Sequence, residues 1–158
     1  TPQVAPSARR CSGFAQRWGL GGLIVINLLP FRSPYPRDVV TAARQGIDIV
    51  GDNRNAVLEV LWEAKASGSP VVVAWGHVGK HLCEKTGRMD EYDFFTGAAL
   101  GAGGVALGVT KGGSPRHPLY VPYGVRPVLW PQAVDGRPEH RPGPWDRQQP
   151  TQSDLFAP

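Results

Sequence analysis

The stretch Leu23–Leu29, which reads LIVINLL, decides the fold of this chain. It is an uninterrupted apolar run rich in β-branched residues, and Asn27 is its single polar member. Such a run predicts a strand buried on both faces, as in parallel sheets that helices cover on either side. The following segment, Pro30–Pro36, holds three prolines in seven residues and is therefore a loop.

Two further apolar runs predict neighbouring strands, Val71–Trp75 (VVVAW) and Val105–Val109 (VALGV). Apolar spacing predicts five helices: Ala8–Trp18 with Gly19 as its cap, Arg37–Arg44, one from Asp52 or Asn53 to Ala66, one around Val78–Lys85 and one near Tyr92–Leu100. Strands that alternate with helices predict an α/β fold, here a three-layer α/β/α sandwich with a mainly parallel central sheet.

The longest predicted helix carries an apolar face of its own. Val57, Leu58, Leu61 and Trp62 recur along it at helical spacing. This spacing is the observation that predicts the helix.

Length and charge predict one folded domain with a tail. We assign residues 1–126 to the domain, because the segment 127–158 holds seven prolines and no apolar periodicity. Residues 1–126 carry 14 Lys and Arg against 9 Asp and Glu, a net charge of +5. This balance suits a phosphate-bearing partner, and it equally suits a solvated surface.

Several function classes find no support in the sequence. No apolar run is long enough for a membrane span, and Cys11 and Cys83 have no zinc-site spacing, so we expect a monomeric cytoplasmic protein without membrane contact. His77 and His81 lie four residues apart without the glutamate of a zinc protease motif. We expect neither a metal nor another cofactor, since GHVGKH also fails the phosphate-loop pattern.

Candidate ligand-binding residues lie at the ends of the predicted strands at three places. They are Asn27, the pair Trp75-Gly76, and the loop TKGGSPRHPLY at Thr110–Tyr120. The carboxyl ends of parallel strands meet at one edge of a sheet, so these residues should converge on a ligand there. The prolines stiffen the loop around His117, which suits ligand binding, and a purely structural turn stays an alternative.

The tail ends in the peptide QSDLF, residues 152–156. It resembles the peptides that bind bacterial sliding clamps, in which Gln precedes a Leu-Phe pair. That resemblance implies a clamp contact through Gln152, Leu155 and Phe156, and a tethered domain would gain local concentration on DNA.

Three stretches together resemble the bacterial and phage family called domain of unknown function 1643. They are ARRCSGFAQRWGLGGLIVINLLPFR, VVVAWGHVGK and LGVTKGGSPRHPLYVP, within residues 8–122. Members of that family usually begin with an Asn-Pro-Ser-Thr-Ala-Asp segment and an acidic pair, which this sequence does not contain, and GDNRN replaces their Gly-Pro-x-Asn-Asp. We therefore expect a divergent or truncated copy.

A more distant resemblance is to the uracil-DNA glycosylases. In that superfamily a buried strand ends in Asn before a Leu-rich turn and an Arg, a later strand ends in Trp-Gly, and a final loop carries His-Pro. LIVINLLPFR, VVVAWG and RHPLY follow the same order here. The resemblance implies the glycosylase fold and a protein that acts on a base in DNA during repair, modification or phage defence.

The resemblance also implies a role for each matching residue. His117 would be catalytic and hydrogen-bond the carbonyl of the leaving base, and Asn27 would read the base edge. Phe31 would either stack on the base or pack in the core, and Leu119 or Tyr120 would fill the gap left in the base stack. The implied nucleic-acid contacts are Arg32, Lys111, Gly112, Gly113, Ser114, Arg116, Leu119 and Tyr120, and the backbone amides of Gly112 to Ser114 would bind phosphates.

The water-activating residue of these enzymes has no counterpart in the sequence. Asp48 and Asp52 are the nearest acids by order, but neither occupies the matching position. Two alternatives to an N-glycosylase therefore stay open. One is a non-catalytic nucleic-acid or nucleotide-binding module, and the other is an enzyme that processes small nucleotides.

Overall fold

The computed structural model describes residues 4–130, which form five α-helices and a small sheet of three strands. In chain order the elements are α1 (Pro6–Arg17), α2 (Pro36–Arg44), α3 (Asn53–Ser67), β1 (Val72–Val73), α4 (Gly76–Thr86), α5 (Met89–Gly101), β2 (Val105–Ala106), the 3₁₀ turn η1 (Pro118–Tyr120) and β3 (Val128–Leu129). All five predicted helices are confirmed. No helix within residues 4–130 is long and apolar enough to cross a membrane.

The sheet is mixed and short. Its order is β1-β2-β3, with β1 parallel to β2 and β3 antiparallel to β2. Each strand has two residues, so only Val72–Val73 of the strand predicted at Val71–Trp75 and only Val105–Ala106 of the strand predicted at Val105–Val109 are present. The chain is thus a mixed α/β protein, and a mainly parallel sheet within a three-layer sandwich stays a prediction.

The prediction of a buried strand at Leu23–Leu29 is wrong for the described structure. The segment forms no strand, and the side chains of Leu23 to Ile26 are 37–65% exposed. The physical reason is the lack of a pairing partner, since the backbone of residues 21–26 makes no hydrogen bond within the described part of the chain. Only Leu29, at the end of the segment, is buried in the core.

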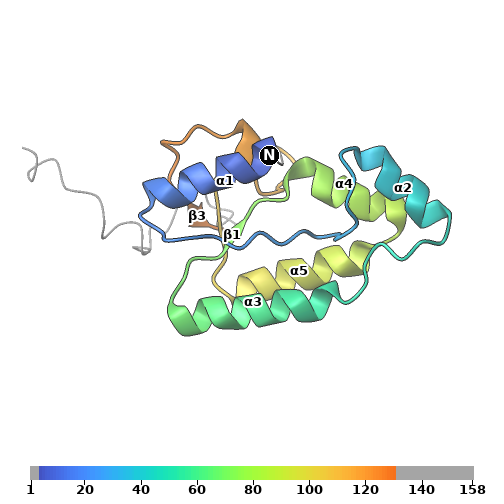
Figure 1. Ribbon diagram of the computed structural model, residues 1–158, viewed down its shortest axis with the longest axis horizontal. Helices are drawn as coiled ribbons and strands as arrows, with labels where there is room; N and C mark the ends of the chain where they lie inside the picture. Colours follow the sequence, from blue (N-terminus) through green and yellow to red (C-terminus); the bar gives the residue numbers. More distant parts are fainter. Residues whose placement is uncertain (1–3, 131–158) are drawn as a thin grey trace, which may run out of the picture.

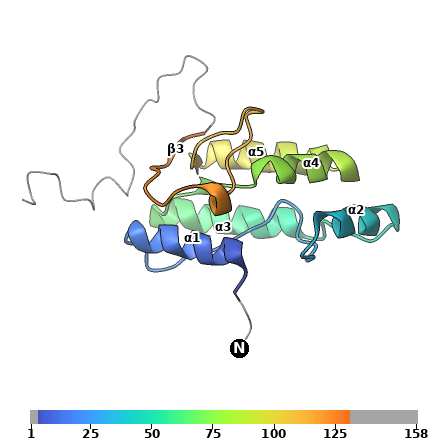
Figure 2. The ribbon, with the colours of Figure 1, turned by 90° about the horizontal axis from the view of Figure 1, so that it is seen from above.

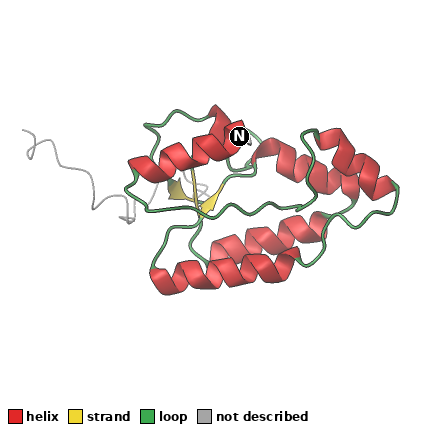
Figure 3. Cartoon of the chain, viewed as in Figure 1, coloured by secondary structure: helices red, strands yellow, loops and turns green. Residues whose placement is uncertain are grey.

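Helices lie on either side of this small sheet. Figure 1 shows α1 on one side and the pair α3 and α5 on the other, while α2 and α4 extend away from the strands (Figures 1 and 3). The side chain of Arg54 on α3 donates to both carboxylate oxygens of Glu91 on α5, at 3.0 and 3.1 Å, and Glu91 is buried. This ion pair holds α3 against α5.

Three apolar clusters form the core. The first joins α2 and α4 and contains Leu29, Val39, Ala42, Ile49 and Cys83. Burial of the Cys83 thiol raises its pKa to about 11. The second lies at the sheet, with Val73, Ala99, Ala106 and Trp130, and the third joins α1 to the 3₁₀ turn through Phe14, Leu107 and Val121. Because β3 pairs with β2 and the buried Trp130 belongs to the second cluster, the described fold continues beyond residue 126.

The predicted apolar face of α3 is only partly buried. Val57 is buried, but Leu58 is 47% exposed and Trp62 is 73% exposed. The two exposed residues lie one turn apart, so the same side of the helix carries both of them into solvent. The sequence pattern could not distinguish this apolar stripe from a core-facing one.

Removing either exposed side chain should therefore cost little stability. We expect Leu58→Ser and Trp62→Ser to change the free energy of unfolding by no more than about 0.5 kcal/mol. Val57→Ala, the control on the buried side, should cost about 2 kcal/mol. Urea unfolding followed by circular dichroism measures all three, and a large loss in Trp62→Ser would contradict the exposed placement.

Candidate functional site

The loop after β2 is held in shape by its own backbone. Val109 and Pro115 form an antiparallel bridge, and the N–H of Thr110 donates to the carbonyl of Ser114 at 2.8 Å. The N–H of Arg116 donates a hydrogen bond to the carbonyl of Gly108 at 2.9 Å. These bonds fix the chain on both sides of the loop tip and bring it back toward the sheet just before His117.

The same loop packs against the first turn of α4. The N–H of Gly76 donates to the carbonyl of Pro115 at 2.9 Å. Gly76 has a φ of +67°, and a Cβ placed on it would lie 3.0 Å from Cβ of His117. Glycine is needed at position 76 for both its left-handed backbone and its close approach to His117. The structure thus brings together the Trp75-Gly76 pair and the His117 loop, as the sequence predicts.

His117 is held as a neutral ring with one defined free donor. Its side chain is half-buried, and burial lowers its pKa below the usual value. The Nδ1 atom accepts a hydrogen bond from the N–H of Leu119 at 3.2 Å. Because Nδ1 is an acceptor in this bond, the proton of the neutral ring resides on Nε2. His117 therefore offers an Nε2–H donor without carrying a positive charge.

The lowered pKa of His117 makes folding stability depend on pH. The unfolded chain, with an ordinary histidine pKa, binds this proton at a higher pH than the folded chain does. Stability from this group is therefore complete above a pH of about 6.5 and is lost as the pH falls from there toward the folded pKa. Urea unfolding at pH 7.5 and 5.5 should show a larger loss for the wild type than for His117→Asn.

Asparagine is the matched control in that comparison. Its side-chain oxygen can still accept the N–H two residues later, as in an Asx turn, but it does not titrate. Equal losses in both proteins would contradict the assigned protonation of His117.

Asn27 lies near the same turn of α4, although its strand is missing. The side chain of Asn27 is exposed, and the backbone carbonyl of Asn27 accepts a hydrogen bond from Nδ2 of Asn53 at 2.9 Å. The same nitrogen lies 3.2 Å from the carbonyl of Leu28, and the Leu28 side chain packs at Gly79, one turn after Gly76. The first turn of α4 is thus flanked by the Asn27 segment and by the His117 loop.

Asn53 is the residue that sequence reasoning missed. It was predicted only as a helix cap, yet it is the first residue of α3, is buried, and makes no side-chain cap bond. Its amide instead fixes the backbone at Asn27 and Leu28. The signal was an asparagine beside an acidic residue in GDNRN, a pattern that also occurs at ordinary helix starts.

The predicted nucleic-acid contacts differ in how accessible they are. Tyr120 is 80% exposed and Leu119 is 37% exposed, and the Tyr120 ring centroid lies 6.0 Å from that of His117. Lys111 and Arg116 are exposed on the same loop, although Nε of Arg116 also donates to the carbonyl of Val109 at 3.3 Å. Leu119 and Tyr120 thus place exposed apolar surface next to His117, and Lys111 and Arg116 add exposed charge to the same loop.

The backbone amides at the loop tip are partly occupied. The N–H of Gly113 donates to the carbonyl of Thr110, and the N–H of Ser114 donates to Oγ1 of Thr110. Both residues were predicted to bind phosphate through these amides. Of the three amides predicted for this role, the N–H of Gly112 alone makes no hydrogen bond to a described residue. Ser114 is also buried.

The remaining predicted residues have other surroundings. Phe31 is half-buried and packs on the cluster of Leu29 and Val39, which is a core role, whereas Arg32 is exposed. Trp75 packs edge to face with Tyr92 and Trp130, as expected of strand-end packing. Gln152, Leu155 and Phe156 lie outside the described residues.

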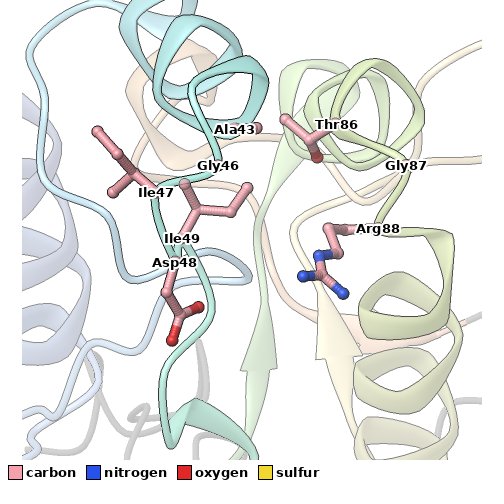
Figure 4. Close-up of a pocket in the computed structure, with 8 residues that line it drawn as sticks. All are labelled: Ala43, Gly46, Ile47, Asp48, Ile49, Thr86, Gly87 and Arg88. Carbon is pink, nitrogen blue, oxygen red and sulfur yellow. The ribbon is translucent and has the colours of Figure 1, made fainter.

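A pocket of about 330 Å³ lies at the opposite end of α4 (Figure 4). Its lining includes Ile47, Asp48, Thr86, Gly87 and Arg88, and none of the predicted site residues. α4 has 11 residues, so its two ends are about 16 Å apart. The predicted site is therefore separate from this pocket.

Asp48 in that pocket already has hydrogen-bond partners. It accepts from the N–H groups of Val50 and Gly51, at 2.9 and 3.0 Å, and Arg88 faces it across the pocket. The Gly51 and Val50 amides, with a smaller effect of Arg88, hold the pKa of Asp48 below its usual value. Such a carboxylate is a weak proton acceptor, and the role of Asp48 in its turn is structural.

The described region contains no cluster of three or more His, Cys, Asp or Glu that could bind a metal.

Comparison with known proteins identifies a family. No curated protein and no solved structure shows a significant match to the chain. The family described as "Protein of unknown function (DUF1643)" matches residues 3–119, which covers every element from α1 to β2 and the loop that carries His117. The chain belongs to this DUF1643 family.

Proposed function

We propose that this protein binds DNA and acts on a single base as a glycosylase-like enzyme, with His117 as the central group. The observation that supports it is the neutral His117 ring, whose Nδ1 is occupied by the N–H of Leu119 and whose Nε2–H is the remaining donor. A neutral donor can stabilise an oxygen on which negative charge develops without binding an anion tightly beforehand.

The chemistry follows from this donor. In base release the bond between the base nitrogen and the sugar carbon C1′ breaks, its electron pair leaves with the base, and water adds to C1′. The Nε2–H of His117 would hydrogen-bond a carbonyl oxygen of the base as that oxygen becomes negative. The exposed carboxamide of Asn27, next to the Leu28 that packs against α4, would bind the base edge through a donor and an acceptor.

Exposed groups around His117 suit a nucleic-acid strand. Lys111 and Arg116 would bind phosphates, and the Tyr120 ring would stack on a base or occupy the place of an extruded one. A base must leave the stack to reach a half-buried histidine, which favours single-stranded or mismatched DNA. We also propose a three-layer α/β/α sandwich of the uracil-DNA glycosylase type, which the helices on either side of the small sheet support.

A non-catalytic DNA-binding module is the second candidate. It is favoured by the local bonding of the two acids considered for water activation. Asp48 is bound in its own turn, and Asp52 accepts from Nδ2 of Asn55 at 2.6 Å. Without a group that activates water, binding would persist while base release would be slow.

The experiment that separates the two candidates uses a panel of modified bases. The full chain is incubated with single-stranded and mismatched DNA that carries uracil, deaminated, oxidised or alkylated bases, and abasic sites are detected by alkaline cleavage. A product that disappears in His117→Ala supports the enzyme. Binding without any product supports the module. Tight binding of mononucleotides without DNA affinity would overturn both and support a nucleotide-processing enzyme.

The tail supplies a separate prediction. We propose that Gln152, Leu155 and Phe156 recruit the domain to a sliding clamp. Deleting residues 152–156 should abolish binding to a purified bacterial clamp in surface plasmon resonance, because the two large apolar side chains would be the anchor. The thermal unfolding of the domain should not change. Clamp binding that survives the deletion would contradict this role.

A further inference from the structure

The segment Leu23–Asn27 is the largest departure from ordinary burial in the described structure. Leu23, Ile24, Val25 and Ile26 are 42%, 65%, 57% and 37% exposed. The backbone of residues 21–26 makes no hydrogen bond within residues 4–130. Contiguous exposed apolar side chains mark an interaction surface, and an unpaired extended backbone is a template for an added strand.

This segment crosses the molecule between two helices. Figures 1 and 2 show it running between α1 and α3. Side chains alternate across a strand, so on pairing Leu23 and Val25 would face one side while Ile24 and Ile26 would face the other. Both sides are apolar, which suits a partner that extends the segment sideways into a sheet.

The sequence itself indicates which segment can pair there. The run from Gly19 to Phe31 contains no charged residue, so two copies of it can approach without like-charge repulsion. Residues 131–158 are rich in proline, which lacks the N–H that pairing needs, and they contain charged residues. In the printed sequence the best complement to Leu23–Asn27 is therefore the same segment of a second copy.

We propose that two copies of this chain associate through antiparallel pairing of their Leu23–Asn27 segments. The two-fold axis passes between the Val25 residues of the two copies, which face each other. In this register Ile24 lies opposite Ile26, and Leu23 lies opposite Asn27. The pairing supplies partners for the exposed backbone and buries apolar side chains on both faces, and its two-fold symmetry closes the assembly at a dimer. It replaces the monomer that composition alone suggests, and it is independent of the proposed DNA chemistry.

The first test is the mass of the full chain in solution. Sedimentation equilibrium across concentrations from about 1 to about 100 µM should show association toward twice the 17.0 kDa of one chain. Ile24→Lys should remain monomeric over the same range, because a charge would enter the paired region. Trp62→Lys is the matched control, since it places the same charge on another exposed apolar residue, and it should still associate. A wild type that stays monomeric throughout overturns the proposal.

The second test reads the register and does not depend on weakening the association. Val25→Cys places two thiols opposite each other across the axis, within the Cα separation that a disulfide spans. Ile24→Cys does not face itself in this register, so its thiols lie a diagonal step apart. Under mild oxidation Val25→Cys should form a covalent dimer on a non-reducing gel, and Ile24→Cys should do so much more slowly. Equal crosslinking of both variants, or none in Val25→Cys, overturns the antiparallel pairing.

Discussion

His117→Ala should slow base release by a factor of about 10² to 10³, the usual effect of removing one donor that faces a developing negative charge. The ring is neutral because burial lowers its pKa, and the N–H of Leu119 occupies Nδ1, so Nε2–H is the one donor that remains for the base. Alanine removes this donor and also leaves the Leu119 N–H without its acceptor. Single-turnover assays on the best substrate of the base panel measure the rate.

His117→Asn is the control that keeps the loop intact. Its side-chain oxygen can accept the Leu119 N–H, so the loop should fold as in the wild type, but its amide would not extend to the position of Nε2. We expect its base release to be as slow as that of His117→Ala, while its thermal unfolding matches the wild type. Base release at the wild-type rate in both variants would contradict the role of His117.

Gly76→Ala should both destabilise the protein and displace His117. An alanine there would adopt a φ of +67°, which costs roughly 1 to 2 kcal/mol for a residue with a Cβ. Its Cβ would also lie 3.0 Å from Cβ of His117. That atom is close to the backbone and cannot move aside by a change of rotamer, so the loop that carries His117 must shift. We expect a loss of about 2 kcal/mol in unfolding free energy, together with loss of base release. Urea unfolding and the base-release assay measure the two effects.

Gly68→Ala separates these two effects. Gly68 ends α3 with a φ of +68°, nearly equal to that of Gly76, but a Cβ there would meet nothing within 4 Å. It should therefore show the backbone cost alone, with base release unchanged. If Gly76→Ala and Gly68→Ala reduce base release equally, the contact between Gly76 and His117 does not position the ring.

The sequence predicts the helices well because their signals are local. Gly19 and Gly68 follow α1 and α3 in the left-handed conformation that helix ends favour, and the prolines at the starts of α1 and α2 suit a first turn. The strand at Leu23–Leu29 fails because an apolar run specifies burial but not the partner that provides it. Strand pairing depends on segments that are distant in the sequence, and no described segment pairs as a strand with Leu23–Leu29.

The candidate site shows the same division. The order of strand ends was enough to predict that Trp75-Gly76 and the His117 loop would meet, and they do so through Pro115 and Gly76. The tautomer of His117 could not be predicted, because it depends on a turn that returns the Leu119 N–H to Nδ1. The role of Asn53 was equally hidden, since its bonds to Asn27 and Leu28 join residues about 25 positions apart.

DNA affinity at several salt concentrations tests the central claim most directly. Fluorescence anisotropy of a labelled single strand with the full chain should show binding that weakens as salt rises. The double variant Lys111→Ala and Arg116→Ala should reduce the slope of log K against log salt by about 1.4, because each lost phosphate contact on a single strand contributes about 0.7. An absence of binding at low salt, or the same slope in both proteins, would contradict a nucleic-acid site at the His117 loop.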